Sequence, residues 1–114
     1  SQLLQAGSEQ VLGQLRLARQ KAIGIQHDQR VTFSTASNNY TVQDLTTNQN
    51  FGPFTFPKGI VLDSATLIEG GVTGTTIAAR SDGRYTGSGE IVLMNGKGSR
   101  DTISVQVSGL ALLR

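Results

Sequence analysis

The sequence predicts an α+β fold in which an N-terminal amphipathic helix packs on an antiparallel β-sheet head. Apolar residues recur at helical spacing over the first 25 positions, and alternating, β-branched runs follow Gln26. Asn-Gly and Asp-Gly pairs separate several of these runs, as in hairpins. With 114 residues, of which 37% are hydrophobic, the chain is long enough to bury one core, so we expect a single domain.

The helix is predicted from one narrow apolar stripe. At about 100° per residue, the stripe positions share one face, and polar side chains occupy the opposite face. Ser1 stands where an N-cap would, although Leu4 takes the place of the Glu or Gln of a capping box. The residues expected to pack the helix on the sheet are Leu4, Val11, Leu15, Ala18, Ala22 and Ile25.

The strands are predicted from period-two alternation between turn signals. The regular spacing of the later runs indicates an antiparallel meander. Residues 46–57 contain both prolines of the chain and three of its four phenylalanines, so we expect an irregular loop whose rings pack against the sheet. Strands are expected over residues 30–34, 40–45, 59–62, 75–80, 89–94, 102–108 and 110–113.

Composition excludes several functional classes. The net charge of +2 is too small to indicate nucleic-acid binding by itself, because that affinity grows with the number of phosphates neutralised. A chain without cysteine has no disulfide, thiolate zinc site or cysteine nucleophile. These residues contain neither a signal peptide nor an apolar run long enough to span a bilayer.

No motif predicts an enzyme. His27 is the only histidine and is followed by Asp28, but a hydrolase also needs a nucleophile, an oriented base and an oxyanion pocket. We therefore interpret His27 as a residue of a solvated loop. There is no HExxH block or spaced histidine cluster for zinc.

Two glycine-rich turns resemble ligand loops only superficially. Residues 82–90 resemble a calcium loop that begins at Asp82. Arg84 and Thr86 then stand at its third and fifth positions, where oxygen ligands are needed, and Leu93 stands at the twelfth, where glutamate is needed. Residues 95–100 resemble a phosphate-binding loop, but Ile91 replaces the first glycine of that motif. Both stretches are predicted to be hairpin turns, and we expect no metal, cofactor or small-molecule substrate.

Two blocks of the sequence resemble a known family. LRLARQKAI at residues 15–23, followed by RVTF at 30–33, is similar to the end of the long helix and the first strand of minor type IV pilins and type II secretion minor pseudopilins of the GspH/FimT type. The segments 77–83, 89–96 and 102–109 resemble the closing strands of that family.

The resemblance implies a structural role. Residues 1–26 would be the C-terminal half of the stem helix and residues 27–114 the β-rich head, together forming one domain. Family members carry a short leader, a methylated N-terminus and an apolar half-helix that anchors them in the bacterial inner membrane with a periplasmic head. The implied function is a minor subunit in filament initiation or tip assembly and in protein export, with other pilins or pseudopilins as partners.

Two further sets of residues follow from the resemblance. Leu3, Leu12 and Leu17 lie off the apolar stripe and are candidate contacts with neighbouring subunits, or else isolated exposed leucines. The alternative function is DNA binding by a minor pilin during DNA uptake. Its candidate contacts are Arg84, Lys97, Arg100 and Arg114, although Leu110 replaces the first arginine of the G-R-x-R tail found in DNA-binding members.

Overall fold

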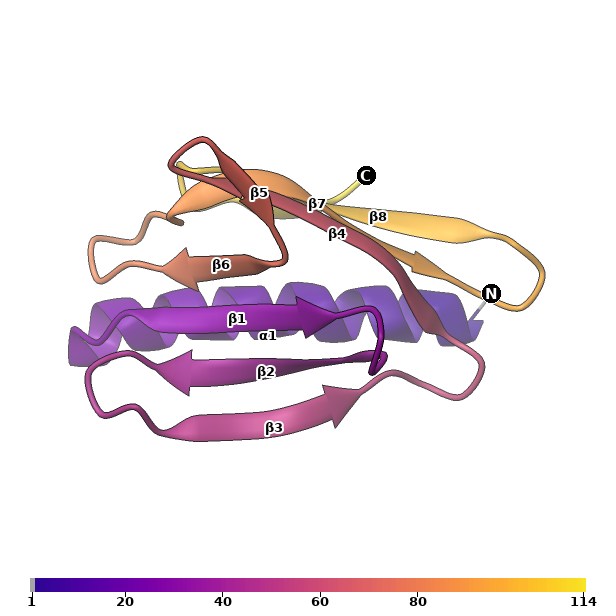
Figure 1. The fold of residues 1–114 in the computed structure, drawn as a ribbon, viewed down its shortest axis with the longest axis horizontal. Helices are drawn as coiled ribbons and strands as arrows, with labels where there is room; N and C mark the ends of the chain where they lie inside the picture. Colours follow the sequence, from indigo (N-terminus) through magenta and orange to yellow (C-terminus); the bar gives the residue numbers. More distant parts are fainter. Residues whose placement is uncertain (1) are drawn as a thin grey trace.

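The computed structural model describes residues 2–114, in which one long helix runs along two antiparallel sheets (Figure 1). Ser1, the candidate N-cap, lies outside the described residues. Helix α1 covers Gln2–Ile25 and is the first element of the fold. The predicted α+β class is confirmed. No helix of residues 2–114 is both long and apolar enough to cross a membrane.

The nine strands of the described chain form two sheets, which we call the first and the second sheet. The first sheet has the order β3-β2-β1-β6, with bounds Asn50–Thr55, Asn39–Asp44, Gln29–Ser34 and Thr76–Ala79. The second has the order β5-β4-β7-β8-β9, with bounds Val72–Gly74, Val61–Glu69, Gly87–Met94, Arg100–Val105 and Ala111–Leu113.

The antiparallel meander predicted for the later runs is confirmed for β7, β8 and β9, which are consecutive neighbours in the second sheet, but not for the run at residues 75–80, which forms β6 of the first sheet. After β3 the chain crosses to the second sheet for β4 and β5, returns to the first for β6, and crosses again before β7. Alternation shows which face a residue takes but not which strand it pairs with, so it does not distinguish one sheet from two. Strand β4 also runs far beyond the predicted end at Leu62, and β5 was not predicted.

The irregular loop expected over residues 46–57 contains a strand. Strand β3 pairs with β2, with a register shift between Tyr40 and Val42. Pro53 is tolerated there because β3 is the outermost strand of the first sheet, where a missing backbone N–H breaks no ladder hydrogen bond.

The core lies between one face of α1 and the inner faces of both sheets. Leu4, Val11, Leu15, Ala18 and Ala22 are at most 4% exposed. Fully burying one large side chain of this kind stabilises the fold by about 1.5–3 kcal/mol. The sheets contribute fully buried side chains that include Leu67, Ile77, Ile91, Leu93 and Ile103.

The prediction for Ile25 is wrong, because its side chain is 48% exposed. The last turn of α1, which contains Ile25, extends past the strands of the first sheet (Figure 1). The expectation that the helix packs on one sheet face is also corrected. Helix α1 contacts β1 and β6 of the first sheet and β7, β8 and β9 of the second.

Candidate partner-binding surface

One flank of α1, facing the second sheet and the β6–β7 loop, is tied to the head by hydrogen bonds from the helix, beside a pocket of about 220 Å³; we call it the second-sheet flank. Arg16 donates from Nη2 to the carbonyl of Ala111 at 3.1 Å, and Arg19 donates from Nε to the carbonyl of Gly83 at 2.6 Å. Gly109 has φ +104°, and a Cβ added there would lie 2.3 Å from the Gly83 oxygen and 2.7 Å from the Arg19 Nε. Only glycine fits at this contact.

Two buried hydroxyls add further hydrogen bonds between the helix and the head. The Tyr85 hydroxyl donates to the Leu15 carbonyl at 2.9 Å. Burial raises the pKa of the Tyr85 phenol, and the charge of the nearby arginines offsets part of that rise, so the hydroxyl stays protonated as a donor. Near the start of the helix, Ser8 hydrogen-bonds Asp101 Oδ2 at 2.7 Å.

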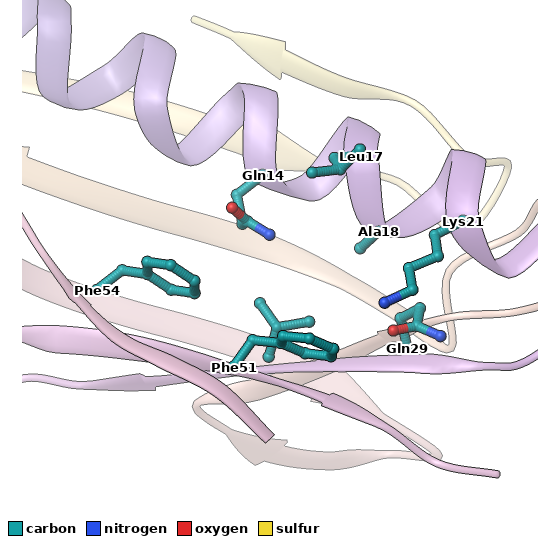
Figure 2. A pocket seen from close by; sticks show the side chains of 8 residues that line it. Gln14, Leu17, Ala18, Lys21, Gln29, Phe51 and Phe54 are labelled. Atoms are coloured by element: carbon teal, nitrogen blue, oxygen red, sulfur yellow. The ribbon is translucent and has the colours of Figure 1, made fainter. Parts of the chain in front are cut away.

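The other flank of α1, facing β1, β2 and β3, keeps an open cleft of about 290 Å³; we call it the first-sheet flank. Towards the start of the helix, Gln10 donates from Nε2 to the Tyr40 hydroxyl at 2.9 Å and to the Thr55 carbonyl at 2.8 Å. Beyond that contact the helix and the sheet edge are separated by the cleft (Figure 2). Its lining residues are Gln14, Leu17, Ala18, Lys21, Gln29, Val42, Phe51 and Phe54.

One end of the cleft is polar. Gln29 is 0% exposed, and its Nε2 donates to the His27 carbonyl at 2.9 Å and also hydrogen-bonds the Asp44 carboxylate. Its Oε1 is buried and has no hydrogen-bond partner among residues 2–114. A buried acceptor without a donor costs about 1–3 kcal/mol. The Lys21 ammonium lies 4.2 Å from the centroid of the Phe51 ring, at the same end of the cleft (Figure 2).

His27 and Asp44 are paired at the end of the first sheet where β2 finishes. The His27 Nδ1 lies 2.9 Å from Asp44 Oδ2, while Asp44 Oδ1 accepts the N–H groups of Thr46 and Thr47. Burial alone would raise the pKa of Asp44, but hydrogen bonds from His27, Thr47, Gln29 and Thr46 lower it well below its usual value of 3.8. The carboxylate therefore stays ionised and fixes the turn between β2 and β3.

The interpretation of His27 as a solvated loop residue is corrected, because its ring is half-buried against Asp44. Asp28, its neighbour in sequence, instead accepts the backbone N–H of Ser81. The pair formed by His27 and Asp44 therefore stabilises a turn. Within residues 2–114, the His27 ring bonds Asp44 and no serine.

Sequence reasoning missed Gln29 and Asp44, although a signal for both was present. Gln29 shares its strand face with Val31 and Phe33, and Asp44 shares its face with Val42 and Tyr40, so both occupy inward positions of alternating strands. A polar residue at such a position is a candidate for a buried hydrogen-bonding role.

The three off-stripe leucines have different surroundings. Leu3 and Leu17 are 51% and 54% exposed, and Leu17 lines the cleft. Leu12 is half-buried against the core, so little of it is left for a partner. Exposed apolar side chains that the sequence did not single out include Val72, Val107, Leu110, Leu112 and Leu113.

The four basic residues named as DNA contacts do not form one patch. Lys97 lies in the turn before β8, and Arg100 is the first residue of that strand. Arg84 instead lies beside the segment that follows β8, where the Tyr85 N–H donates to the Val107 carbonyl. Arg100 pairs with Asp63 at 3.1 Å, and Arg114 pairs with Glu90. The candidate set is thus divided between the two ends of a strand and partly neutralised.

Comparison with known proteins gives a structural match. No protein-family model matches the sequence, and no curated protein sequence matches it. The structure is similar to that of the minor pseudopilin EpsH from the type 2 secretion system of Vibrio cholerae, with a TM-score of 0.74 at 16% sequence identity. The match covers 98% of this chain and 96% of that chain. The chain therefore has the fold of a minor pseudopilin.

Proposed function

We propose that this chain is a non-enzymatic minor subunit of a pilin-like filament, either a type II secretion pseudopilus or a type IV pilus. The observation that carries the proposal is the likeness to EpsH across nearly the full length of both chains. Helix α1 acts as the lower part of a stem and the two sheets form the head. The subunit takes part in filament initiation or tip assembly together with related subunits.

The cellular setting belongs to the same proposal. An apolar segment encoded upstream of Ser1 anchors the subunit in the inner membrane by a single pass, with the head in the periplasm and, in the mature protein, a methylated N-terminus. The support is the family resemblance of residues 15–23 and 30–33. A run of about 20 apolar residues encoded upstream would agree with this anchor, and its absence would contradict it.

Cysteine cross-linking in the native organism tests the assembly role, because the chain carries no cysteine of its own. The thiol is labelled with a maleimide reagent whose other end is photoreactive and inserts into any neighbouring side chain. We expect the full-length protein with Leu17→Cys, on the stem helix, to form adducts with other pilin-like subunits after illumination. Val72→Cys is the matched control, because Val72 is 70% exposed but lies on the β5 hairpin. Equal adduct yields at the two sites, or none at either, would contradict a stem-mediated assembly.

DNA uptake is the alternative function, and the arrangement of its candidate residues does not favour it. Arg100 and Arg114 are both in ion pairs. A gel shift with duplex DNA at low salt tests it, and binding that is lost with Arg100→Ala or Arg114→Ala would make DNA uptake the better proposal.

A further inference from the structure

We propose that the cleft on the first-sheet flank of α1 is a docking site for a phenolic side chain, that of a tyrosine on a neighbouring pilin-like subunit. The choice of a subunit as its source rests on the proposed function. The choice of a phenol rests on the size, the walls and the hydrogen-bonding groups of the cleft itself.

The size of the cleft fits a single side chain. Pockets for drug-sized ligands and cofactors range from about 300 to 1,000 Å³. At about 290 Å³, this cleft lies at the lower limit. It opens between a helix and the outermost strand of a sheet, so a side chain on another protein can enter from solvent (Figure 2).

The walls of the cleft favour a flat apolar body. Phe51 and Phe54 come from β3, Val42 from β2, and Leu17 and Ala18 from α1. Both rings are only half-buried. An aromatic side chain between them buries a large apolar area and adds ring–ring contacts.

The polar end of the cleft requires a hydrogen-bond donor. The Gln29 amide cannot be turned over, because its nitrogen already serves the His27 carbonyl and the Asp44 carboxylate, two groups that only accept. Its oxygen is therefore fixed on the side of Lys21 and Phe51, where it is buried and has no donor among residues 2–114 (Figure 2). Buried acceptors without a donor are rare in folded proteins, and this one lies in a cavity wall.

The Lys21 ammonium, beside the Phe51 ring, supplies the complementary group. A ligand that satisfies this end donates one hydrogen bond to Gln29 Oε1 and accepts one from Lys21 Nζ. A phenol does both with one oxygen at the end of a flat ring. A carboxylate has no hydrogen to donate to Gln29, an ammonium or guanidinium is repelled by Lys21, and a phenyl ring leaves the Gln29 oxygen unpaired.

Titration with small probes, followed by backbone amide NMR of this chain, tests the chemistry of the site without any filament. We expect p-cresol to bind with shifts centred on Leu17, Lys21 and Phe51. We expect 4-methylanisole, which has the same ring but no donor, to bind about two- to tenfold more weakly, the range expected from one net hydrogen bond. Equal affinities, or shifts that do not centre on the cleft, overturn the proposal.

Two variants separate the polar and the apolar contributions to binding of the probes in the cleft. Lys21→Met keeps the length of the side chain and should reduce the preference for p-cresol over 4-methylanisole, whereas Phe51→Ala should weaken both probes. Gln20→Met, one residue away on the exposed face of α1, is the matched control and should change neither affinity. Amide spectra of each variant verify that it is folded. A preference that Lys21→Met leaves unchanged overturns the role of Lys21.

The source of the phenol is tested in the cell. In the full-length Leu17→Cys protein, adding Phe51→Ala should lower the yield of adducts at least several-fold, while adding Gln20→Met should not. An unchanged yield overturns docking at the cleft and leaves the proposed function in place. Loss of all adducts in the Leu17→Cys protein itself contradicts the proposed function instead.

Discussion

The two flanks of helix α1 differ in how they meet their sheets. On the second-sheet flank, Arg16, Arg19 and Leu15 are tied to the head by direct hydrogen bonds. On the first-sheet flank, Gln10 makes the direct hydrogen bonds and a cleft follows it. The apolar stripe of the helix packs on both sheets, so the difference in hydrogen bonding between the two flanks comes from the side chains beside the stripe. Hydrogen bonds along the second-sheet flank fix the helix, whereas the cleft of the first-sheet flank, with its aromatic walls, leaves surface for a partner.

The largest expected effect comes from placing a methyl group in the close contact at Gly109 on the second-sheet flank. Gly109→Ala should lower the free energy of unfolding by about 2–4 kcal/mol, because it combines a left-handed backbone with a steric overlap. Urea denaturation measures this change. Gly13→Ala is the control, because Gly13 lies in the helix with open space around it, and it should stabilise the protein by about 0.5–1 kcal/mol. Equal effects at the two glycines would contradict the tight contact.

The next effect depends on pH and concerns the end of the first sheet. Because the folded-state pKa of Asp44 is lowered, its carboxylate contributes stability that is complete well above pH 3.8 and is lost as the pH falls through the folded-state pKa. Asp44→Asn should therefore lower the melting temperature at pH 7, and the gap from the wild type should shrink as the pH falls below about 4. A gap that stays constant down to pH 2 would contradict this assignment.

A matched pair of tyrosines compares the flanks directly. Tyr85→Phe removes a buried hydrogen bond to Leu15 and should cost about 1–1.5 kcal/mol. Tyr40→Phe removes one acceptor of the Gln10 amide, which still donates to the Thr55 carbonyl. This variant should therefore lower the free energy of unfolding by less than about 0.5 kcal/mol. Thermal or urea unfolding of both variants measures the difference. The reverse order would show that the first-sheet flank is the more strongly held.

The smallest effect on stability is expected at the rim of the cleft. Leu17→Ala should change the free energy of unfolding by no more than about 0.5 kcal/mol, because Leu17 is 54% exposed. The same variant should reduce assembly in the cell, where co-purification with other subunits measures it. A large loss of stability would instead place Leu17 in the core.

The sequence predicted the helix and most strands because their periodicity is local. It placed Ile25 wrongly, because periodicity does not show where the sheet under the helix ends. It missed β3 because Gly and Pro are typical of loops, and an outermost strand tolerates them. It also missed the two-sheet arrangement, which depends on pairing between distant strands.

The cleft could not be predicted from the sequence, for a different reason. Its polar end depends on the direction in which one amide points, and that direction is set by His27 and Asp44 rather than by Gln29 itself. The inward position of Gln29 was readable from the alternation of β1, but its unpaired oxygen was not.

The bond between Arg16 and Ala111 joins residues 95 positions apart and has a consequence for biogenesis. Strand β9 packs against the helix, so the domain reaches its final form only after residues 111–113 have been translated. Contacts of such long sequence separation form slowly. A nascent chain halted a few residues short of β9 would hold a loosely seated helix, exposed to proteases and to premature association.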